Sequence, residues 1–178
     1  QVIDSVGNES PQFVDLVGDA TPELVFTHHG RYAYASFEPG QGLEGWKIQP
    51  ISEANAHPQF GHGLGVGDVD GDGRQDVLCK DGWFRQPEEL GGPWPFTAVP
   101  LGDYGGADMY VDDVDGDGDG DIITSLAAHD FGLAWFEQQV DGEQVTWVKH
   151  LIMGATPEEN RYGVVFSELH SVALADID

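Results

Sequence analysis

Aspartates at alternate positions form two closely similar loops in this chain. The loops read DVDGDGRQD at residues 68–76 and DVDGDGDGD at residues 113–121. Each offers four carboxylates and one well-placed backbone carbonyl, so the ligand set is made only of oxygen. Calcium accepts about six to eight oxygen ligands in flexible geometry, whereas zinc is more often held by nitrogen and sulfur. The sequence therefore predicts two structural calcium sites.

The predicted calcium ligands follow the same order in both loops. They are Asp68, Asp70, Asp72, Arg74 through its carbonyl and Asp76 in the first loop, and Asp113, Asp115, Asp117, Asp119 through its carbonyl and Asp121 in the second. The glycines between them permit the left-handed backbone that wraps an ion. We expect a dissociation constant of about 10⁻⁴ to 10⁻³ M, as in extracellular modules. That affinity implies a secreted or periplasmic location.

Two weaker copies of the loop flank this pair. In DLVGDATPE at residues 15–23, Val17 replaces the third-position aspartate and Ala20 replaces a glycine, so we expect no ion there. A further copy begins at Asp176 and stops at Asp178, the last residue of the sequence.

An EF-hand is the first alternative to this interpretation. It requires a glutamate at position 12 and flanking helices, but position 12 is Cys79 in one loop and Thr124 in the other, and the following segments DVLCK and DIITS favour strands. Solvated aspartate turns without an ion are the second alternative. Repulsion between closely packed carboxylates argues against them.

Short β-rich segments recur around each loop, in the order strand, loop, strand, aromatic strand, outer strand. We expect strands at 24–26, 36–38, 46–51, 62–68, 76–80, 83–85, 96–101, 108–113, 121–125, 135–137 and 145–153. Four antiparallel strands in about 40 to 50 residues make one blade of a β-propeller. The predicted fold is therefore all-β, a β-propeller with four-stranded antiparallel blades.

The blade boundaries follow from this repeat. Residues 1–178 are predicted to be a partial β-propeller with approximate blades at 10–55, 61–102 and 106–154, and with 166–178 as the start of a fourth. Complete propellers have about four to eight blades. We therefore expect further blades of the same polypeptide in a longer, seven-bladed propeller.

Composition excludes several classes of partner. The formal net charge is −25, from 32 acidic and 7 basic residues, so nucleic acid and anionic membrane surfaces would be repelled. No apolar run is long enough to predict a membrane span. The 25 glycines and 10 prolines disfavour long helices. A single cysteine cannot form an internal disulfide, so we expect metal ions, not disulfides, to stabilise the fold.

Most histidines fall at the ends of strands opposite to the aspartate loops. His62 and His170 precede inner strands, and the turns beyond the loops carry His28, His29 and His129. His57 lies in a connection between blades, whereas His150 is expected to be structural. Imidazoles beside carboxylates such as Asp108 and Asp130 could ligate zinc or transfer protons. The candidate catalytic residues are His62, His170 and Asp108. The alternative is that these histidines are ordinary polar loop residues.

Aromatic side chains on the same turns suggest a second use for this face. The residues are Tyr32, Tyr34, Tyr104, Tyr110 and Phe131. If exposed, they could stack on sugar rings, but packing between blades explains turn aromatics equally well.

The string DVDGDGRQDVLCKDGWFRQP and its echo DVDGDGDGDIITSLAAHDFGLAWFEQ resemble the repeats of the VCBS and FG-GAP-like family. This resemblance covers essentially the whole chain and implies a β-propeller with calcium in the aspartate loops. A more distant likeness, carried by His62 and His170 at the starts of inner strands, is to the propeller of aldos-2-ulose dehydratases. That likeness implies zinc and sugar chemistry.

Two functions follow as expectations. The first is a calcium-stabilised extracellular binding or scaffold module that recognises carbohydrate or protein. The second is a metal-dependent sugar lyase, similar to a dehydratase, with a histidine site at the channel mouth. Bound zinc would favour the second, whereas histidines more than about 10 Å apart would be too distant to share one ion.

Overall fold

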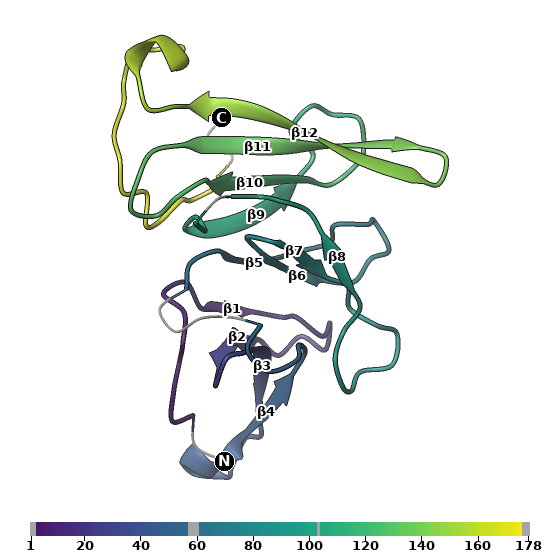
Figure 1. The fold of residues 1–178 in the computed structure, drawn as a ribbon. Helices are drawn as coiled ribbons and strands as arrows, with labels where there is room; N and C mark the ends of the chain where they lie inside the picture. Colours follow the sequence, from purple (N-terminus) through teal and green to yellow (C-terminus); the bar gives the residue numbers. More distant parts are fainter. Residues whose placement is uncertain (1–2, 57–60, 103, 176–178) are drawn as a thin grey trace.

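The computed structural model describes residues 3–56, 61–102 and 104–175, and within them the regular secondary structure is almost entirely β (Figure 1). The two helical segments are single 3₁₀ turns, η1 (Gly42–Gly45) and η2 (Pro157–Glu159). None of the described helices is long and apolar enough to cross a membrane.

Twelve strands in the described residues form two sheets. The first sheet has the order β1-β2-β3-β4, and the second has the order β12-β11-β10-β9-β5-β6-β7-β8. The bounds are β1 (Gln12–Val14), β2 (Glu23–His28), β3 (Arg31–Phe37), β4 (Trp46–Pro50), β5 (Leu64–Gly67), β6 (Asp76–Cys79), β7 (Gly82–Phe84), β8 (Phe96–Ala98), β9 (Asp108–Asp112), β10 (Asp121–Ser125), β11 (Leu133–Asp141) and β12 (Gln144–Met153).

The strands group into three units of four consecutive antiparallel strands: unit 1 is β1 to β4, unit 2 is β5 to β8 and unit 3 is β9 to β12. Units 2 and 3 join where β5 and β9 run parallel, with Leu64 opposite Asp108 and Gly65 opposite Met109. A Cβ on Gly65 would lie 2.3 Å from the carbonyl oxygen of Met109. The glycine therefore allows the first strands of two units to touch.

Most of the hydrophobic core lies between the units, and a smaller buried cluster of Phe26, Ala33 and Ala35 belongs to unit 1 alone. Side chains of units 1 and 2 form one buried cluster, and those of units 2 and 3 form another. Tyr32 of unit 1 contacts Phe84 of unit 2 with ring centroids 5.2 Å apart, and Tyr34 lies 6.1 Å from Trp94. Tyr32 and Tyr34 are therefore not exposed for stacking on sugars; both pack between units, which is the alternative given for them. Tyr104 is 78% exposed, as expected for a turn residue.

Pairing of the strands corrects one predicted equivalence. Phe84 pairs with Val77 and Phe136 with Ile122, just after the aspartate of each loop. At the corresponding place in unit 1, Leu24 pairs with Ala35 and not with Phe37. Phe37 of unit 1 therefore stands two residues beyond the place that Phe84 and Phe136 occupy in their units. The short turn after His28 starts β3 at Arg31, earlier than predicted.

The segment predicted to start a fourth blade differs from expectation. Its described part, 166–175, has no strand assigned, and Asp176 to Asp178 lie outside the described residues. The segment still lies along β9, because Tyr110 Oη donates to the Val172 carbonyl at 2.6 Å and Ser171 Oγ donates to Asp108 Oδ2 at 3.1 Å. Side chains make these contacts, so no regular backbone ladder forms.

Candidate functional site

The three loops share one hydrogen-bond pattern. The carboxylate at position 9 accepts the N–H of position 2 at 3.0 Å in every loop, as Glu23 from Leu16, Asp76 from Val69 and Asp121 from Val114. The position 1 aspartate accepts the N–H groups four and five residues later, as Asp15, Asp68 and Asp113 do. The loop conformation is thus fixed by the chain itself, including in the copy that lacks Asp at position 3.

Three carboxylates converge in each of the two complete loops. Asp68, Asp70 and Asp76 each place an oxygen within 4.8 Å of the others, and Asp113, Asp115 and Asp121 do the same. The predicted ligands Asp72 and Asp117 are not in these groups. Asp72 faces two arginines, and Asp117 Oδ1 accepts the N–H of Asp119 at 2.9 Å. Three of the four predicted carboxylates therefore meet in each loop.

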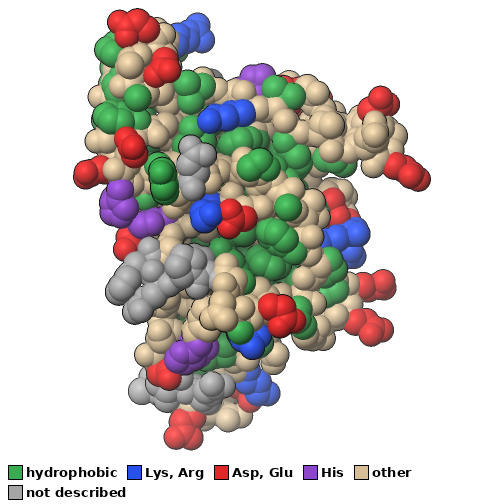
Figure 2. All heavy atoms as spheres, viewed as in Figure 1, with side chains coloured by type: hydrophobic (Ala, Val, Ile, Leu, Met, Phe, Trp, Pro, Cys, Tyr) green, Lys and Arg blue, Asp and Glu red, His purple; other side chains and the backbone are tan. Residues whose placement is uncertain are grey.

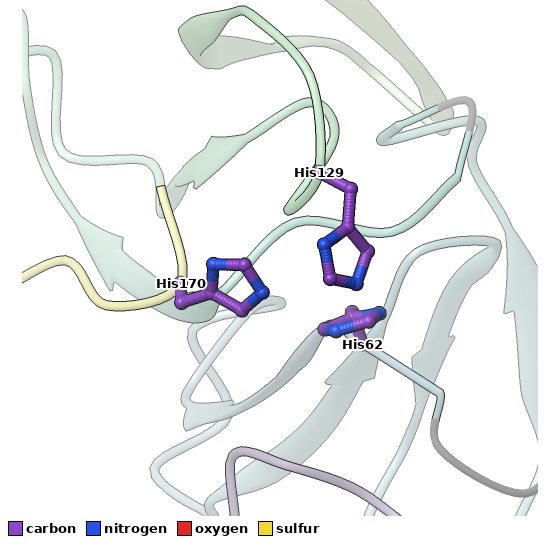
Figure 3. Close-up of side chains that lie close together, drawn as sticks. All are labelled: His62, His129 and His170. Carbon is purple, nitrogen blue, oxygen red and sulfur yellow. The ribbon is translucent and has the colours of Figure 1, made fainter. Parts of the chain in front are cut away.

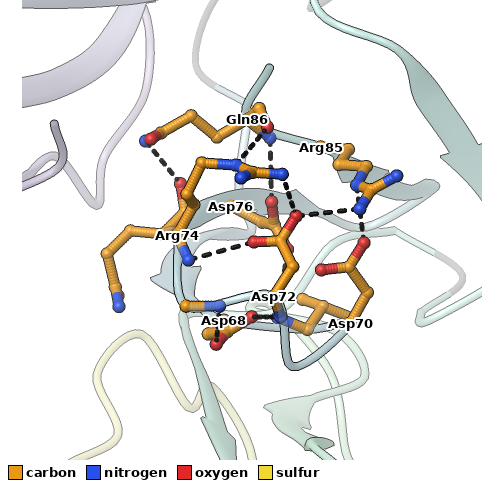
Figure 4. A network of polar contacts seen from close by, with 10 residues as sticks. Asp68, Asp70, Asp72, Arg74, Asp76, Arg85 and Gln86 are labelled. Atoms are coloured by element: carbon orange, nitrogen blue, oxygen red, sulfur yellow. Dashed lines mark hydrogen bonds and ion pairs between the residues drawn. The ribbon is translucent and has the colours of Figure 1, made fainter. Parts of the chain in front are cut away.

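Arginines neutralise part of the first loop (Figure 4). Arg85 Nε lies 2.6 Å from Asp70 Oδ2 and its NH2 lies 2.8 Å from Asp72 Oδ2, while Arg74 also pairs with Asp72. Although burial opposes it, contact with Arg85 and Arg74 lowers the pKa of Asp72. Among the described ion pairs, no lysine or arginine contacts the 113–121 loop. The negative charge of the 113–121 loop is therefore not offset by a basic side chain, so this loop needs a bound cation more than the 68–76 loop does.

Burial makes the ionised form of the Asp76 carboxylate less stable. Its side chain is fully buried, and burial raises its pKa to about 6. The N–H groups of Gln86 and Val69 lower this pKa, and the nearby Asp70 and Asp72 carboxylates raise it. A cation held among these carboxylates would favour the ionised form, because opposite charges stabilise each other most strongly away from water.

A glutamine ties each later loop to the unit before it. Gln86 Nε2 donates to the Leu16 carbonyl of unit 1 at 2.7 Å, and Gln138 Nε2 donates to the Val69 carbonyl of unit 2 at 2.9 Å. The same amides also donate to their own loops, and their backbone N–H groups donate to Asp76 and Asp121. We call each of these two arrangements a glutamine clasp. Sequence reasoning missed both, although the recurring Trp-Phe-x-Gln pattern at 83–86 and 135–138 carries the signal.

Three histidines meet at the other end of the strands (Figure 3). The ring centroids of His62 and His129 are 4.8 Å apart, those of His129 and His170 are 4.6 Å apart, and those of His62 and His170 are 5.6 Å apart. Each ring offers a nitrogen within 4.8 Å of nitrogens on the other two. The structure therefore brings the predicted His62 and His170 together and adds His129.

Backbone contacts bring these rings together. Gly105 packs on His62 so closely that a Cβ would lie 2.7 Å from the His62 carbonyl oxygen, and the Gly105 carbonyl accepts the N–H of Ala128 at 2.9 Å. Glu168 donates its N–H to the Asp130 carbonyl at 2.9 Å, which places His170 beside His129. Three segments distant in sequence thus hold the three imidazoles, which we call the histidine triad.

Second contacts orient two of the rings. His170 Nδ1 lies 3.1 Å from the Glu168 carbonyl, which only accepts, so Nδ1 carries the proton. In the neutral ring the lone pair is then on Nε2. His62 Nε2 lies 3.1 Å from Glu9 Oε2. Glu9 is separated from His62 by more than 50 residues of sequence, and no sequence motif pointed to it.

Asp108 is not part of the triad's group. Its Oδ1 accepts from Gln12 Nε2 at 3.2 Å and its Oδ2 accepts from Ser171 Oγ. These bonds link the first strands of units 1 and 3 to the segment after His170. Of the other histidines, His28 and His29 gather separately beside Asp4, His150 stacks on Trp135 at 4.3 Å, and His57 lies outside the described residues.

Loops and triad lie at opposite ends of the strands. The 113–121 loop follows the end of β9, whereas His62 precedes β5 and His129 lies in the turn between β10 and β11. Because β5 and β9 are parallel, the aspartate loops lie beyond the ends of these strands and the histidines lie before their starts. In Figure 2, histidine side chains lie at the left edge next to acidic side chains, and further acidic side chains project at the right edge.

Comparison of the chain with protein-family models, curated proteins and solved structures found no match.

The clasp makes a stability prediction. Gln138→Ala should lower the free energy of unfolding by about 1–3 kcal/mol, because it removes the side-chain donor from the buried carbonyl of Val69 and the partly buried carbonyl of Gly120. Urea denaturation at fixed calcium concentration measures this. The neighbouring exposed Gln139→Ala is the matched control and should change stability by less than about 0.5 kcal/mol. Equal effects of the two substitutions would show that the clasp contributes nothing.

Proposed function

We propose that this chain is part of a calcium-stabilised β-propeller of the VCBS and FG-GAP-like kind, acting as an extracellular binding or scaffold module. Three successive units with the same strand order support this, as does the contact of two units along their first strands. Propeller blades meet in this way around a central channel. Further blades would belong to the same polypeptide.

The calcium proposal rests on the converging carboxylates. Two loops each bring three carboxylate oxygens together on a backbone already shaped by its own N–H groups. The carbonyls of Arg74 and Asp119 would complete the oxygen ligands. The ions would be structural, because the same loops carry the glutamine clasps between units.

The end of the strands with the histidine triad is the proposed ligand face. It combines three imidazoles with the exposed side chains of Tyr104 and Phe131. Aromatic faces stack on sugar rings, and imidazoles and hydroxyl groups exchange hydrogen bonds. We therefore assign carbohydrate, or a protein surface of similar polarity, as the ligand.

Metal-dependent sugar lyase activity is the second candidate, and the histidine triad is the observation that favours it. Three nitrogen ligands suit zinc, which often takes three protein ligands and leaves one position open. A bound zinc ion would polarise a sugar oxygen. Glu9, which contacts His62, is then the candidate for proton transfer in place of Asp108.

Calcium should stabilise the protein through its loops. At a calcium concentration of about ten to a hundred times the dissociation constant, each occupied site adds about 1.4–2.7 kcal/mol, a rise of several degrees in Tm. Asp115→Asn should remove most of the rise at its loop, and Asp70→Asn a smaller share, because Arg85 already pairs with Asp70. Differential scanning fluorimetry with calcium and with EDTA measures both.

Asp19→Asn in the 15–23 loop is the control for these variants, since no ion is expected there. It should keep the full response to calcium. A Tm that does not change between EDTA and millimolar calcium in the parent protein would refute structural ions.

Zinc should bind at the triad with calcium already saturating. His129→Gln is expected to weaken this binding at least tenfold, because it removes one of the three imidazole ligands. Isothermal titration with zinc measures it, and His150→Gln is the control because His150 lies on the outer strand against Trp135. The same zinc affinity in the parent and in His129→Gln would remove the basis for a lyase.

Turnover separates the two functions. The zinc-loaded protein is incubated with a 2-keto sugar, and water elimination is followed through the absorbance of the unsaturated product. Turnover that is lost in His129→Gln supports the lyase. Sugar binding without turnover supports the binding module.

A further inference from the structure

A second group of metal-capable side chains lies in unit 1, away from the triad. It consists of Asp4, His28 and His29, which each place a ligand atom within 4.8 Å of the others. Asp4 belongs to the segment before β1, and the two histidines stand at the turn between β2 and β3. No residue of this group belongs to the triad or to an aspartate loop.

The separations between the ligand atoms fit an ion better than they fit hydrogen bonds. Asp4 Oδ1 lies 3.6 Å from His28 Nε2 and 3.4 Å from His29 Nε2. Good N–H···O bonds are shorter, about 2.7–3.2 Å. Two ligands of one tetrahedral zinc ion, each about 2.0–2.1 Å from it, are about 3.3–3.4 Å apart. The distances from Asp4 Oδ1 to the two imidazole nitrogens are therefore close to the ligand–ligand distance of a tetrahedral zinc site.

His28 is held in the tautomer that a metal requires. Its Nδ1 lies 2.9 Å from the Ser5 carbonyl, which only accepts, so Nδ1 carries the proton. The lone pair of the neutral ring is then on Nε2, the atom that faces Asp4. A backbone carbonyl behind a ligating imidazole is the usual support in metal sites. The side chain of His28 is only 12% exposed, so the ring is fixed in place.

His29 occupies a backbone conformation that disfavours most side chains. Its φ is +48° and that of Gly30 is +73°, as in a two-residue turn with both residues left-handed. Asn-Gly is the preferred sequence for such a turn. Histidine at this place aims a second ring at Asp4, with the two ring centroids 4.1 Å apart. Unfavourable backbone geometry of this kind is common at functional sites.

We infer that Asp4, His28 and His29 form a second transition-metal site that takes a divalent ion of the zinc type. Two imidazoles and one carboxylate suit zinc, nickel or copper better than calcium. Asp4 and His29 are exposed, so a position stays open to water or an external ligand. A bound ion would also fasten the segment before β1 to unit 1, next to the bonds that Gly7 and Asn8 already make with Thr27.

Stoichiometry of zinc binding tests this inference separately from the triad. In saturating calcium, the parent protein is expected to bind two zinc ions by isothermal titration. His29→Asn should bind one, because it removes a ligand while creating the preferred Asn-Gly turn, and its Tm without zinc should not fall. His129→Gln should also bind one, and the double variant none.

Asp4→Asn gives the independent check on the carboxylate. It should weaken the second site at least about tenfold and leave the triad unchanged. If His29→Asn and Asp4→Asn both keep the zinc stoichiometry and affinities of the parent, Asp4 merely pairs with protonated imidazoles and the site is overturned. If His129→Gln alone keeps the parent stoichiometry, the triad fails while this site stands.

Discussion

One buried carboxylate in each loop organises the structure around it. Asp76 and Asp121 are completely buried, and both oxygens of each accept backbone N–H groups. A buried ionised group is stable only when it is fully hydrogen-bonded or paired with a charge. The chain supplies the hydrogen bonds, and the neighbouring aspartates supply a place for a cation. The start of the second strand, the loop and the contact between units all depend on this one group.

The 15–23 loop shows what remains when the ligand set is incomplete. Glu23 is 1% exposed and accepts the N–H groups of Leu16 and Val17, so the turn is kept although Val17 stands where the others have aspartate. Hydrogen bonds therefore set the loop shape, and charge density sets the affinity for an ion. Arg74 and Arg85 modify that density in the second unit without altering the shape.

Local sequence patterns predicted much of the fold. The strands after each loop were found within one or two residues, because β-rich segments next to glycine-rich turns are a local signal. The register of unit 1 was not found, because it depends on where the turn at His29 and Gly30 places β3. The histidine triad was found in part. His62 and His170 stand at matching places in the repeat, whereas Glu9 reaches His62 only through tertiary packing.

The glutamine clasps give the array a direction. Gln86 and Gln138 reach back to the unit before them, and by strand register the same place in unit 1 is Phe37, which makes no such bond. Each clasp hydrogen bond couples its two partners equally, so a disturbance in either unit weakens the other through the shared amide. Unit 2 takes part in both clasps, so loosening of unit 1 or of unit 3 would remove one of its two ties to a neighbour.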